Sequence, residues 1–364
     1  MKIVSVAGTR PNFIKIAPLI EEMNKHSEIR QLLVHTGQHY DATMSKFFFD
    51  DLEIPKPDIN LGVGSASDAI QTAKIILAFE KVILKEKPDL VVVVGDVNST
   101  FAAAITAKKC GIKVAHVEAG LRSFDMTMPE EINRILTDHI SDFLFTTEES
   151  GNKNLIREGI DKNKIFFVGN VMIDTLLKHK EKSKKSKILS KLKLDKNNYA
   201  VLTLHRPSNV DDRKSLENIL SILNEIKKEI KIVFPIHPRT LKNLMKYRLL
   251  KYIKNKKNII VTEPLGYLDF LCLMSNSKFV LTDSGGIQEE TTVLGVPCVT
   301  MRNTTERPVT AKEGTNVLVS TDKVKIINVC NSLVKEASVK GRIPKFWNGS
   351  AAKRVMNIIL KNLN

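Results

Sequence analysis

Short apolar runs alternate with longer amphipathic runs along most of the chain. The apolar runs are rich in Val, Ile and Leu, and amphipathic stretches such as 14–24, 69–85 and 100–110 lie between them. Strands that are apolar on both faces and alternate with helices indicate parallel sheets covered by helices on both sides. We predict strands at residues 2–7, 31–35, 90–94, 114–117, 143–146 and 165–168, and then at 199–204, 231–236, 259–261, 279–282, 297–301 and 316–319.

The two series of strands are similar in length and predict two doubly wound, Rossmann-like α/β domains facing a central cleft. A chain of 364 residues has room for two average domains. We place the boundary so that the domains span residues 1–170 and 171–346, and the final helical segment, 347–364, is a candidate to pack back on the first domain. Ligands bind at the carboxyl ends of the strands in such sheets, so the cleft is the expected active site.

The net charge of +16 raises the question of a nucleic-acid partner. Much of this charge is local, because nine lysines between Lys178 and Lys196 stand against only Glu181 and Asp195, a net charge of +7. Few aromatic residues lie nearby to stack on bases, so we interpret this run as a solvated helix or an inter-domain segment. An anionic substrate explains a positive surface equally well, and no nucleic-acid partner is expected.

Other features of the composition exclude further classes. No apolar run approaches the ~20 residues that span a bilayer, and the first residues lack a signal peptide's longer apolar core, so we expect a cytoplasmic protein without a membrane partner. The four cysteines have no paired spacing and indicate reduced interior residues, neither disulfides nor a metal site. The segment Gly62-Val63-Gly64 partly matches a dinucleotide fingerprint, but it follows no predicted strand and lacks the third glycine, so no nicotinamide site is expected.

The most informative segment runs from Thr282 to Glu290. It places Ser284, Gly285 and Gly286 between a strand and a helix start, where free N–H groups attract phosphate and glycines allow a ligand to approach closely. Glu290, about one turn further on, is placed to accept hydrogen bonds from ribose hydroxyls. The alternative is a tight turn in which the acidic residues only favour the helix start.

Two cations follow the first strand. Arg10 comes directly after Gly8-Thr9, and Lys15 lies about one helical turn later. Two cations beside a helix N-terminus form a suitable clamp for a diphosphate. An arginine and a lysine on a solvated turn explain the same pattern, and the residues alone do not separate the two interpretations.

Three carboxylates converge on the same predicted rim. Asp96 follows strand 90–94, Glu118 follows strand 114–117, and Glu130 lies in a predicted helix start that has Pro129 in its first turn. Capping or the helix dipole explains each one singly, and for Glu131 we favour the dipole. These roles do not explain the clustering, so the three carboxylates are candidates for proton transfer.

Two histidines end neighbouring strands of the second half. His205 precedes Arg206 after strand 199–204, and His237 ends strand 231–236 two residues before Arg239. A lone histidine is more often a structural hydrogen-bonding group than a catalyst. Two histidines at adjacent strand ends, each with an arginine nearby, indicate a pocket for an anion.

Taken together, these motifs resemble the non-hydrolysing UDP-N-acetylglucosamine 2-epimerases. The similarity runs from residue 8 to about residue 314 in the order of that family, and the final helix is also similar. The matching segments are Gly8-Thr9-Arg10-Pro11 with Lys15, Thr36-Gly37-Gln38-His39, Gly95-Asp96, His116-Val117-Glu118-Ala119-Gly120-Leu121-Arg122, Pro129-Glu130-Glu131 with Asn133-Arg134, His205-Arg206, Asp283-Ser284-Gly285-Gly286 through Glu290, and Thr304-Thr305-Glu306-Arg307-Pro308.

The resemblance implies the two-domain fold of B-type glycosyltransferases, with UDP held by the C-terminal domain and the acid and base groups carried by the N-terminal domain. It implies a homodimer, a UDP-sugar substrate, and neither a cofactor nor a metal. The implied catalytic residues are Asp96, Glu118, Glu130 and His205. The implied substrate-binding residues are Arg10, Lys15, Arg134, His237, Ser284, Gly285, Gly286 and Glu290.

The implied reaction expels UDP from C1 as the C2 proton leaves, which gives a 2-acetamidoglucal, and then adds UDP back with protonation from the opposite face. Alternatives are a hydrolysing 2-epimerase that releases N-acetylmannosamine and UDP, a glycosyltransferase of the same fold, and a basic nucleic-acid-binding protein. This chain departs from the family pattern at Pro207 and at Pro238-Arg239, near the region where bacterial members bind a second, activating substrate molecule. Allosteric activation is therefore left open.

Overall fold

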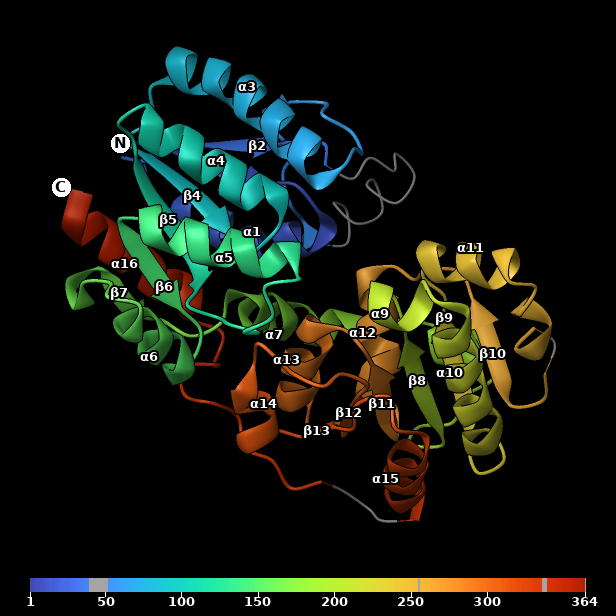
Figure 1. Ribbon diagram of the computed structural model, residues 1–364. Helices are drawn as coiled ribbons and strands as arrows, with labels where there is room; N and C mark the ends of the chain where they lie inside the picture. The colour runs from blue at the N-terminus through green and yellow to red at the C-terminus, as the bar shows by residue number, and fades with distance from the viewer. Residues whose placement is uncertain (39–51, 255, 336–338, 364) are drawn as a thin grey trace. The chain divides into compact units, whose positions relative to one another are not determined.

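The computed structural model describes residues 1–38, 52–254, 256–335 and 339–363. The chain forms two compact units, one of Met1–Lys178 with Lys345–Asn364 and the other of His179–Pro344. The chain passes from the first unit to the second inside helix α7 (Val171–Ser183), whereas the sequence pattern places the boundary at the start of that helix. Figure 1 shows the elements of each unit.

The first unit is built on a seven-stranded sheet in which every paired strand is parallel, in the order β3-β2-β1-β4-β5-β6-β7. The first six positions have the strand order of a doubly wound dinucleotide-binding sheet. The strands are β1 (Lys2–Ala7), β2 (Arg30–His35), β3 (Ile59–Asn60), β4 (Leu90–Val94), β5 (Lys113–Ala119), β6 (Phe143–Thr146) and β7 (Ile165–Phe167). The helices are α1 (Arg10–Met23), α3 (Asp68–Glu86), α4 (Asn98–Lys109), α5 (Pro129–Ile140), α6 (Glu149–Arg157) and α16 (Ala351–Leu363), with the short η1 (Lys162–Lys164).

The central strand β4 explains why the sheet is covered on both faces. All five of its residues are apolar and buried, so neither face can be left to solvent. The C-terminal segment joins this unit through polar contacts as well as packing on α1. Asp174 accepts the N–H groups of Ala351 and Ala352 at the start of α16, and Trp347 donates its indole N–H to the carbonyl of Thr147.

The second unit repeats the topology with six parallel strands in the order β10-β9-β8-β11-β12-β13. The strands are β8 (Tyr199–Thr203), β9 (Lys231–Pro235), β10 (Ile259–Thr262), β11 (Phe279–Thr282), β12 (Cys298–Thr300) and β13 (Asn316–Leu318). The helices are α8 (Ile188–Lys191), α9 (Pro207–Val210), α10 (Arg213–Ile226), α11 (Pro238–Lys246), α12 (Tyr267–Ser275), α13 (Gly285–Leu294), α14 (Pro308–Lys312) and α15 (Lys323–Lys335), with the short η2 (Leu250–Tyr252).

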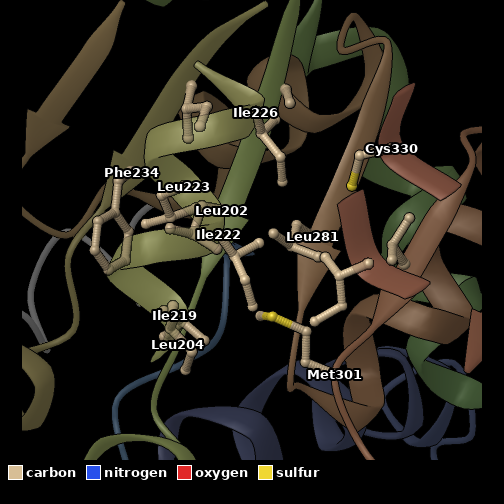
Figure 2. Packing of buried hydrophobic residues seen from close by; sticks show 14 of the residues in the cluster. Leu202, Leu204, Ile219, Ile222, Leu223, Ile226, Phe234, Leu281, Met301 and Cys330 are labelled. Carbon is tan, nitrogen blue, oxygen red and sulfur yellow. The ribbon is translucent and has the colours of Figure 1, made fainter. Parts of the chain in front are cut away.

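The core of the second unit shows how the sequence pattern specifies one face of a helix. Ile219, Ile222, Leu223 and Ile226 of α10 recur at intervals of three and four residues and are buried beside the sheet. Figure 2 shows these side chains together with Leu202, Phe234, Leu281 and Met301 of the sheet and its strand ends. The prediction of two doubly wound parallel domains is confirmed by the two sheets.

Each sheet has one point at which the strand order reverses, between β1 and β4 in the first unit and between β8 and β11 in the second. Ligands of open α/β sheets bind outside the carboxyl ends of the strands at this point. The glycine segment at residues 62–64 needs a correction, because it does follow a strand, the two-residue β3. The helix after it begins only at Asp68, so the segment is not the strand–turn–helix of a dinucleotide fingerprint.

Two further expectations from the composition bear on the fold. The four cysteines are free; three of them are buried and Cys110 is half-buried. Within the described ranges, no helix is both long and apolar enough to cross a bilayer.

Candidate active site

The reversal point of the first unit is held together by Asn12, which the sequence motifs did not single out. Its Oδ1 accepts the N–H groups of Gly8 and Thr9, at 3.2 and 3.0 Å, in the turn after β1. Its Nδ2 donates to the carbonyl of Val94, the last residue of β4, at 2.9 Å. One buried side chain therefore ties the carboxyl ends of the two central strands to the start of α1.

A buried ion pair lies at the same strand ends. Lys15, in the second turn of α1, pairs through Nζ with Oε2 of Glu118, and the two side chains are only 8% and 5% exposed. A Cβ at Gly95 would lie 3.0 Å from the Lys15 ammonium, and Gly95 has a φ of +70°. Glycine is therefore needed where the β4 turn passes over this pair.

Glu118 itself has a left-handed backbone, with a φ of 76°, at an irregularity in the pairing of β5 with β6. Few residues other than glycine adopt this conformation, and strained residues cluster at functional sites. From this position the Glu118 carboxylate pairs with Lys15.

Asp96 is held by an arginine from α5. Arg134 Nε and Nη2 lie 3.1 and 2.7 Å from Asp96 Oδ2, and Nη1 lies 2.5 Å from Glu131 Oε2. Glu131 also accepts the N–H groups of Ser123 and Phe124, so it fixes the loop before α5. From the sequence we interpreted Glu131 only as a complement to the helix dipole. In the structure Glu131 is 1% exposed, and its hydrogen bonds also hold the loop before α5.

The other predicted residues of the first unit do not take part in the Lys15–Glu118 pair or the Arg134–Asp96 pair. Arg10 is the first residue of α1 and is half-buried. Glu130 is half-buried in the first turn of α5, and among the described residues it forms no hydrogen bond or ion pair. Gln38, of the predicted motif 36–39, accepts from the Ser99 hydroxyl at 2.6 Å, whereas His39 lies outside the described residues.

In the second unit, the residues of the predicted anion site lie at the start of α13. Ser284 is the N-cap residue, and Gly285 and Gly286 supply the first N–H groups, which have no partner within a helix. A Cβ at Gly285 would lie 2.6 Å from Arg307 Nη1, so glycine lets this guanidinium approach the helix start. Arg307 is 5% exposed and pairs with Glu289 at 2.8 Å. Both a helix N-terminus and a cation are thus available to a phosphate.

An aspartate–histidine pair ends strands β11 and β8. Asp283 Oδ1 lies 2.9 Å from His205 Nδ1, and Asp283 also accepts the N–H groups of His205 and Arg206. Burial opposes the ionisation of Asp283, but the hydrogen bonds from His205, Arg206 and Asn209 hold its pKa below the usual value. The carboxylate therefore fixes the His205 ring through one nitrogen, and the ring is 38% exposed.

The rim of the second unit carries the remaining predicted residues. The exposed His237 caps α11, accepts the N–H of Arg239 at 3.2 Å, and has its ring 5.7 Å from the His205 ring. Glu290 is 6% exposed, and Oε1 lies 3.5 Å from the Tyr267 hydroxyl. Asp96 and Glu118 in the first unit and His205 and His237 in the second thus lie at strand ends, whereas Glu130 and Glu290 lie within helices, and all of their catalytic and binding roles stay predictions.

Glu306, which the sequence singled out only as part of a motif, accepts hydrogen bonds from several arginines. It accepts from Arg302 at 2.9 and 3.0 Å and from Arg206 at 3.5 Å, although it is 1% exposed. A buried carboxylate that is paired in this way holds cations near the start of α13 without leaving a charge uncompensated. No cluster of three or more His, Cys, Asp and Glu residues suited to a metal ion occurs in the described part of the chain.

Comparisons with known proteins show the family and the fold to which the chain is similar. Residues 21–360 match the family described as UDP-N-acetylglucosamine 2-epimerase. The Methanocaldococcus jannaschii UDP-N-acetylglucosamine 2-epimerase is 46% identical over 99% of each chain, and its crystal structure with UDP-GlcNAc and UDP covers 100% of both chains with a TM-score of 0.94. A Pseudomonas aeruginosa UDP-2,3-diacetamido-2,3-dideoxy-D-glucuronate 2-epimerase is 40% identical over 99% of this chain and 100% of its own. A lipopolysaccharide outer core galactosyltransferase, 14% identical with a TM-score of 0.53 and 99% of each chain covered, shares the fold alone.

Proposed function

Because this chain belongs to the UDP-N-acetylglucosamine 2-epimerase family, we propose that it interconverts UDP-N-acetylglucosamine and UDP-N-acetylmannosamine without hydrolysis. The observation that carries the proposal is the placement of two complementary groups at the reversal points of the two sheets. The first unit has the Lys15–Glu118 pair and Asp96, which can move protons. The second has the α13 N-terminus, which can hold a diphosphate.

The first step is an elimination. The C2–H bond breaks, its electrons form a C1=C2 double bond, and the bond from C1 to the diphosphate oxygen breaks, so that UDP leaves with the electron pair. Negative charge grows on the leaving phosphate, where donors fixed in advance are most effective. The N–H groups of Gly285 and Gly286, with Arg10 and Arg307, are our proposed donors.

The second step adds UDP back to C1 while C2 receives a proton on the opposite face. Inversion requires proton-transferring groups that reach both faces of C2. We assign these transfers to Asp96, Glu118 and Glu130. Lys15 compensates the charge of the buried Glu118, and Arg134 fixes the side chain of Asp96.

His205 is proposed to act on the leaving group. Its Nδ1 is held by Asp283, so the ring orientation is set and Nε2 is the nitrogen available to the substrate. Glu290 is proposed to bind the ribose hydroxyls, and Ser284 the diphosphate. Arg134 and His237 are proposed to contact the substrate, Arg134 from beside Asp96 and His237 from beside His205.

Three wider features belong to the same proposal. We place the enzyme in the cytoplasm, as a homodimer, in the supply of precursors for cell-surface polysaccharide. The support is the family and its soluble UDP-sugar substrate class. Sedimentation of the purified protein tests the dimer, and a monomer at enzyme-assay concentrations would remove that part of the proposal.

The test is proton NMR of the purified protein with UDP-N-acetylglucosamine as the only added sugar. A mixture of the two UDP-sugar epimers at a fixed ratio, with no free sugar, supports the proposal. Free N-acetylmannosamine with UDP identifies the hydrolysing alternative, which the comparisons do not favour. An unchanged substrate rejects both and points to assays with acceptor sugars for a glycosyltransferase.

A second candidate substrate is UDP-2,3-diacetamido-2,3-dideoxy-D-glucuronate. The observation that favours it is the 40% identity, over nearly the whole chain, to the Pseudomonas aeruginosa enzyme named for that sugar. The two substrates differ at C3 and C6 and share C2, so the same chemistry serves both. A reaction that contains both UDP-sugars identifies the preferred substrate, because the ratio of the two kcat/KM values sets the ratio of the two products.

A further inference from the structure

His116 is a fully buried histidine in β5 whose two ring nitrogens both face acceptors. Nε2 lies 2.8 Å from the carbonyl oxygen of Gly95, and Nδ1 lies 2.6 Å from Asp138 Oδ1. A carbonyl can only accept, so Nε2 carries a hydrogen. Burial opposes the ionisation of Asp138, but His116 and Arg122 together lower its pKa. Both ring nitrogens of His116 are therefore held by fixed partners, one in the turn after β4 and one in α5.

Asp138 brackets the strained residue Glu118. One carboxylate oxygen meets His116, two residues before Glu118, and the other accepts the N–H of Gly120, two residues after it, at 3.0 Å. Arg122 Nη1 lies 2.7 Å from the same second oxygen. Because Glu118 has a φ of 76°, its conformation needs support on both sides, and Asp138 supplies both supports from α5.

The same network reaches Asp96 by two routes. The Gly95 carbonyl that accepts from His116 precedes Asp96 in the chain, and the Gly95 N–H donates to Val117 in β5 at 3.0 Å. Arg134, which holds the Asp96 side chain, lies one turn before Asp138 on α5. Residues of one helix, α5, therefore support both Asp96 and Glu118.

The geometry assigns His116 and Asp138 as positioning residues that fix Asp96 and Glu118 for proton transfer at C2. The assignment rests on the proposed epimerase function, because the carboxylates act only if that chemistry occurs. Neither residue is required to touch the substrate. Partners that orient reactive groups typically contribute about 10–100-fold to activity, and displacing a catalytic group by about 1 Å can cost about 100-fold.

The variants Asp138→Asn, His116→Phe and His116→Gln test this role. Glutamine can still place an N–H donor toward the Gly95 carbonyl, whereas phenylalanine cannot. We expect Asp138→Asn and His116→Phe to lower kcat about 10–100-fold per folded molecule, with KM and the Kd for UDP within about twofold of wild type. His116→Gln is expected to recover a measurable part of the loss.

Asp142→Asn is the matched control. Asp142 also accepts a backbone N–H of β5, from Val114 at 2.8 Å, and pairs with Lys108, but at the opposite end of the strand. We expect this variant to lower the melting temperature without changing kcat. Unchanged kcat in Asp138→Asn and His116→Phe, or an equal loss in Asp142→Asn, overturns the positioning role.

A ¹⁵N NMR spectrum of His116 tests the geometry without activity. We expect Nε2 of His116 to carry a bonded hydrogen that it donates to the carbonyl of Gly95. An Nε2 without a bonded hydrogen in the wild type overturns the network. Wild-type protein that turns over no UDP-sugar rejects the proposed function, and with it the catalytic role of these residues. An active wild type with unaffected variants rejects the positioning role alone.

Discussion

Arg134 holds Asp96 with two nitrogens of one guanidinium, Nε at 3.1 Å and Nη2 at 2.7 Å from the same oxygen, Oδ2. The arginine is 3% exposed, and its remaining terminal nitrogen meets Glu131. A guanidinium held in this way is a rigid support, because its planar donors fix the carboxylate in direction as well as in distance. The orientation of Asp96 thus depends on a residue of α5 that lies 38 positions further along the chain.

Replacing Arg134 with glutamine is expected to lower kcat about 100-fold, because Asp96 loses both of its arginine contacts and Glu131 loses one. Steady-state rates with UDP-N-acetylglucosamine measure the effect. The control is Arg213→Gln, which removes an exposed pair with Glu217 and should leave both stability and activity close to those of the wild type. Equal rates for wild type and Arg134→Gln would contradict the supporting role.

Lys15→Met separates stability from function at the buried ion pair. Removing the ammonium takes the lysine partner from the buried Glu118 carboxylate, so the free energy of unfolding should fall by about 3–5 kcal/mol and activity should be lost. In the double variant Lys15→Met, Glu118→Gln, stability should largely return while activity stays absent. Denaturant unfolding and rate measurements check both. A double variant as unstable as Lys15→Met would show that the charge of Glu118 does not cause the loss of stability.

Gly285→Ala should weaken UDP binding. The new Cβ would lie 2.6 Å from Arg307 Nη1, and Arg307 cannot yield freely because it is buried and paired with Glu289. We expect the Kd for UDP in titration calorimetry to rise at least about tenfold, or about 1.4 kcal/mol. Gly295→Ala, at the other end of α13, meets no atom but has a φ of +72°, so it should lower stability and leave the Kd unchanged.

Asp174 should make the protein less stable as the pH rises. Burial raises its pKa to about 6, against the lowering effect of the Ala352 and Ala351 N–H groups. The folded protein then binds this proton more tightly than the unfolded chain does, so the contribution to stability is complete below about pH 4 and is lost as the pH rises through about 6. Relative to Asp174→Asn, the wild type should lose about 3 kcal/mol of unfolding free energy between about pH 4 and pH 7.5.

Denaturant unfolding of both proteins at the two pH values measures this difference, and a difference that does not change with pH would contradict it. Asp212→Asn is a useful comparison. The N–H of Ser215 lowers the pKa of Asp212 at the start of α10, so its contribution is lost as the pH falls, which is the opposite sign.

Much of the fold and part of the site could be predicted from the sequence. Strands such as β4 are apolar at every position, and this local signal, together with the alternation with helices, was enough for two parallel sheets. Because the carboxyl ends of such strands meet at one edge, Asp96 and Glu118 could be expected to lie near one another, whereas the pairing of Lys15 with Glu118 was not predicted. The resemblance to a known family then predicted their roles.

The supports of the site could not be predicted in the same way. Asn12 bonds to the carbonyl of Val94, and Asp138 bonds to His116, across 82 and 22 positions of the chain. Such pairings are decided by how elements pack, and no local pattern of residues carries them. The left-handed backbone of Glu118 was also invisible, since a glutamate in a strand is expected to be extended.

The measurement that tests the central claim most directly is the exchange of the C2 proton of UDP-N-acetylglucosamine in deuterated water. Elimination and re-addition require that proton to leave and another to arrive, so we predict deuterium at C2 of the UDP-sugar epimer that accumulates, with no free N-acetylmannosamine in solution. Asp96→Asn and Glu118→Gln should each slow this exchange strongly. Epimer that retains the original hydrogen at C2, or a substrate that neither exchanges nor epimerises, would contradict the account.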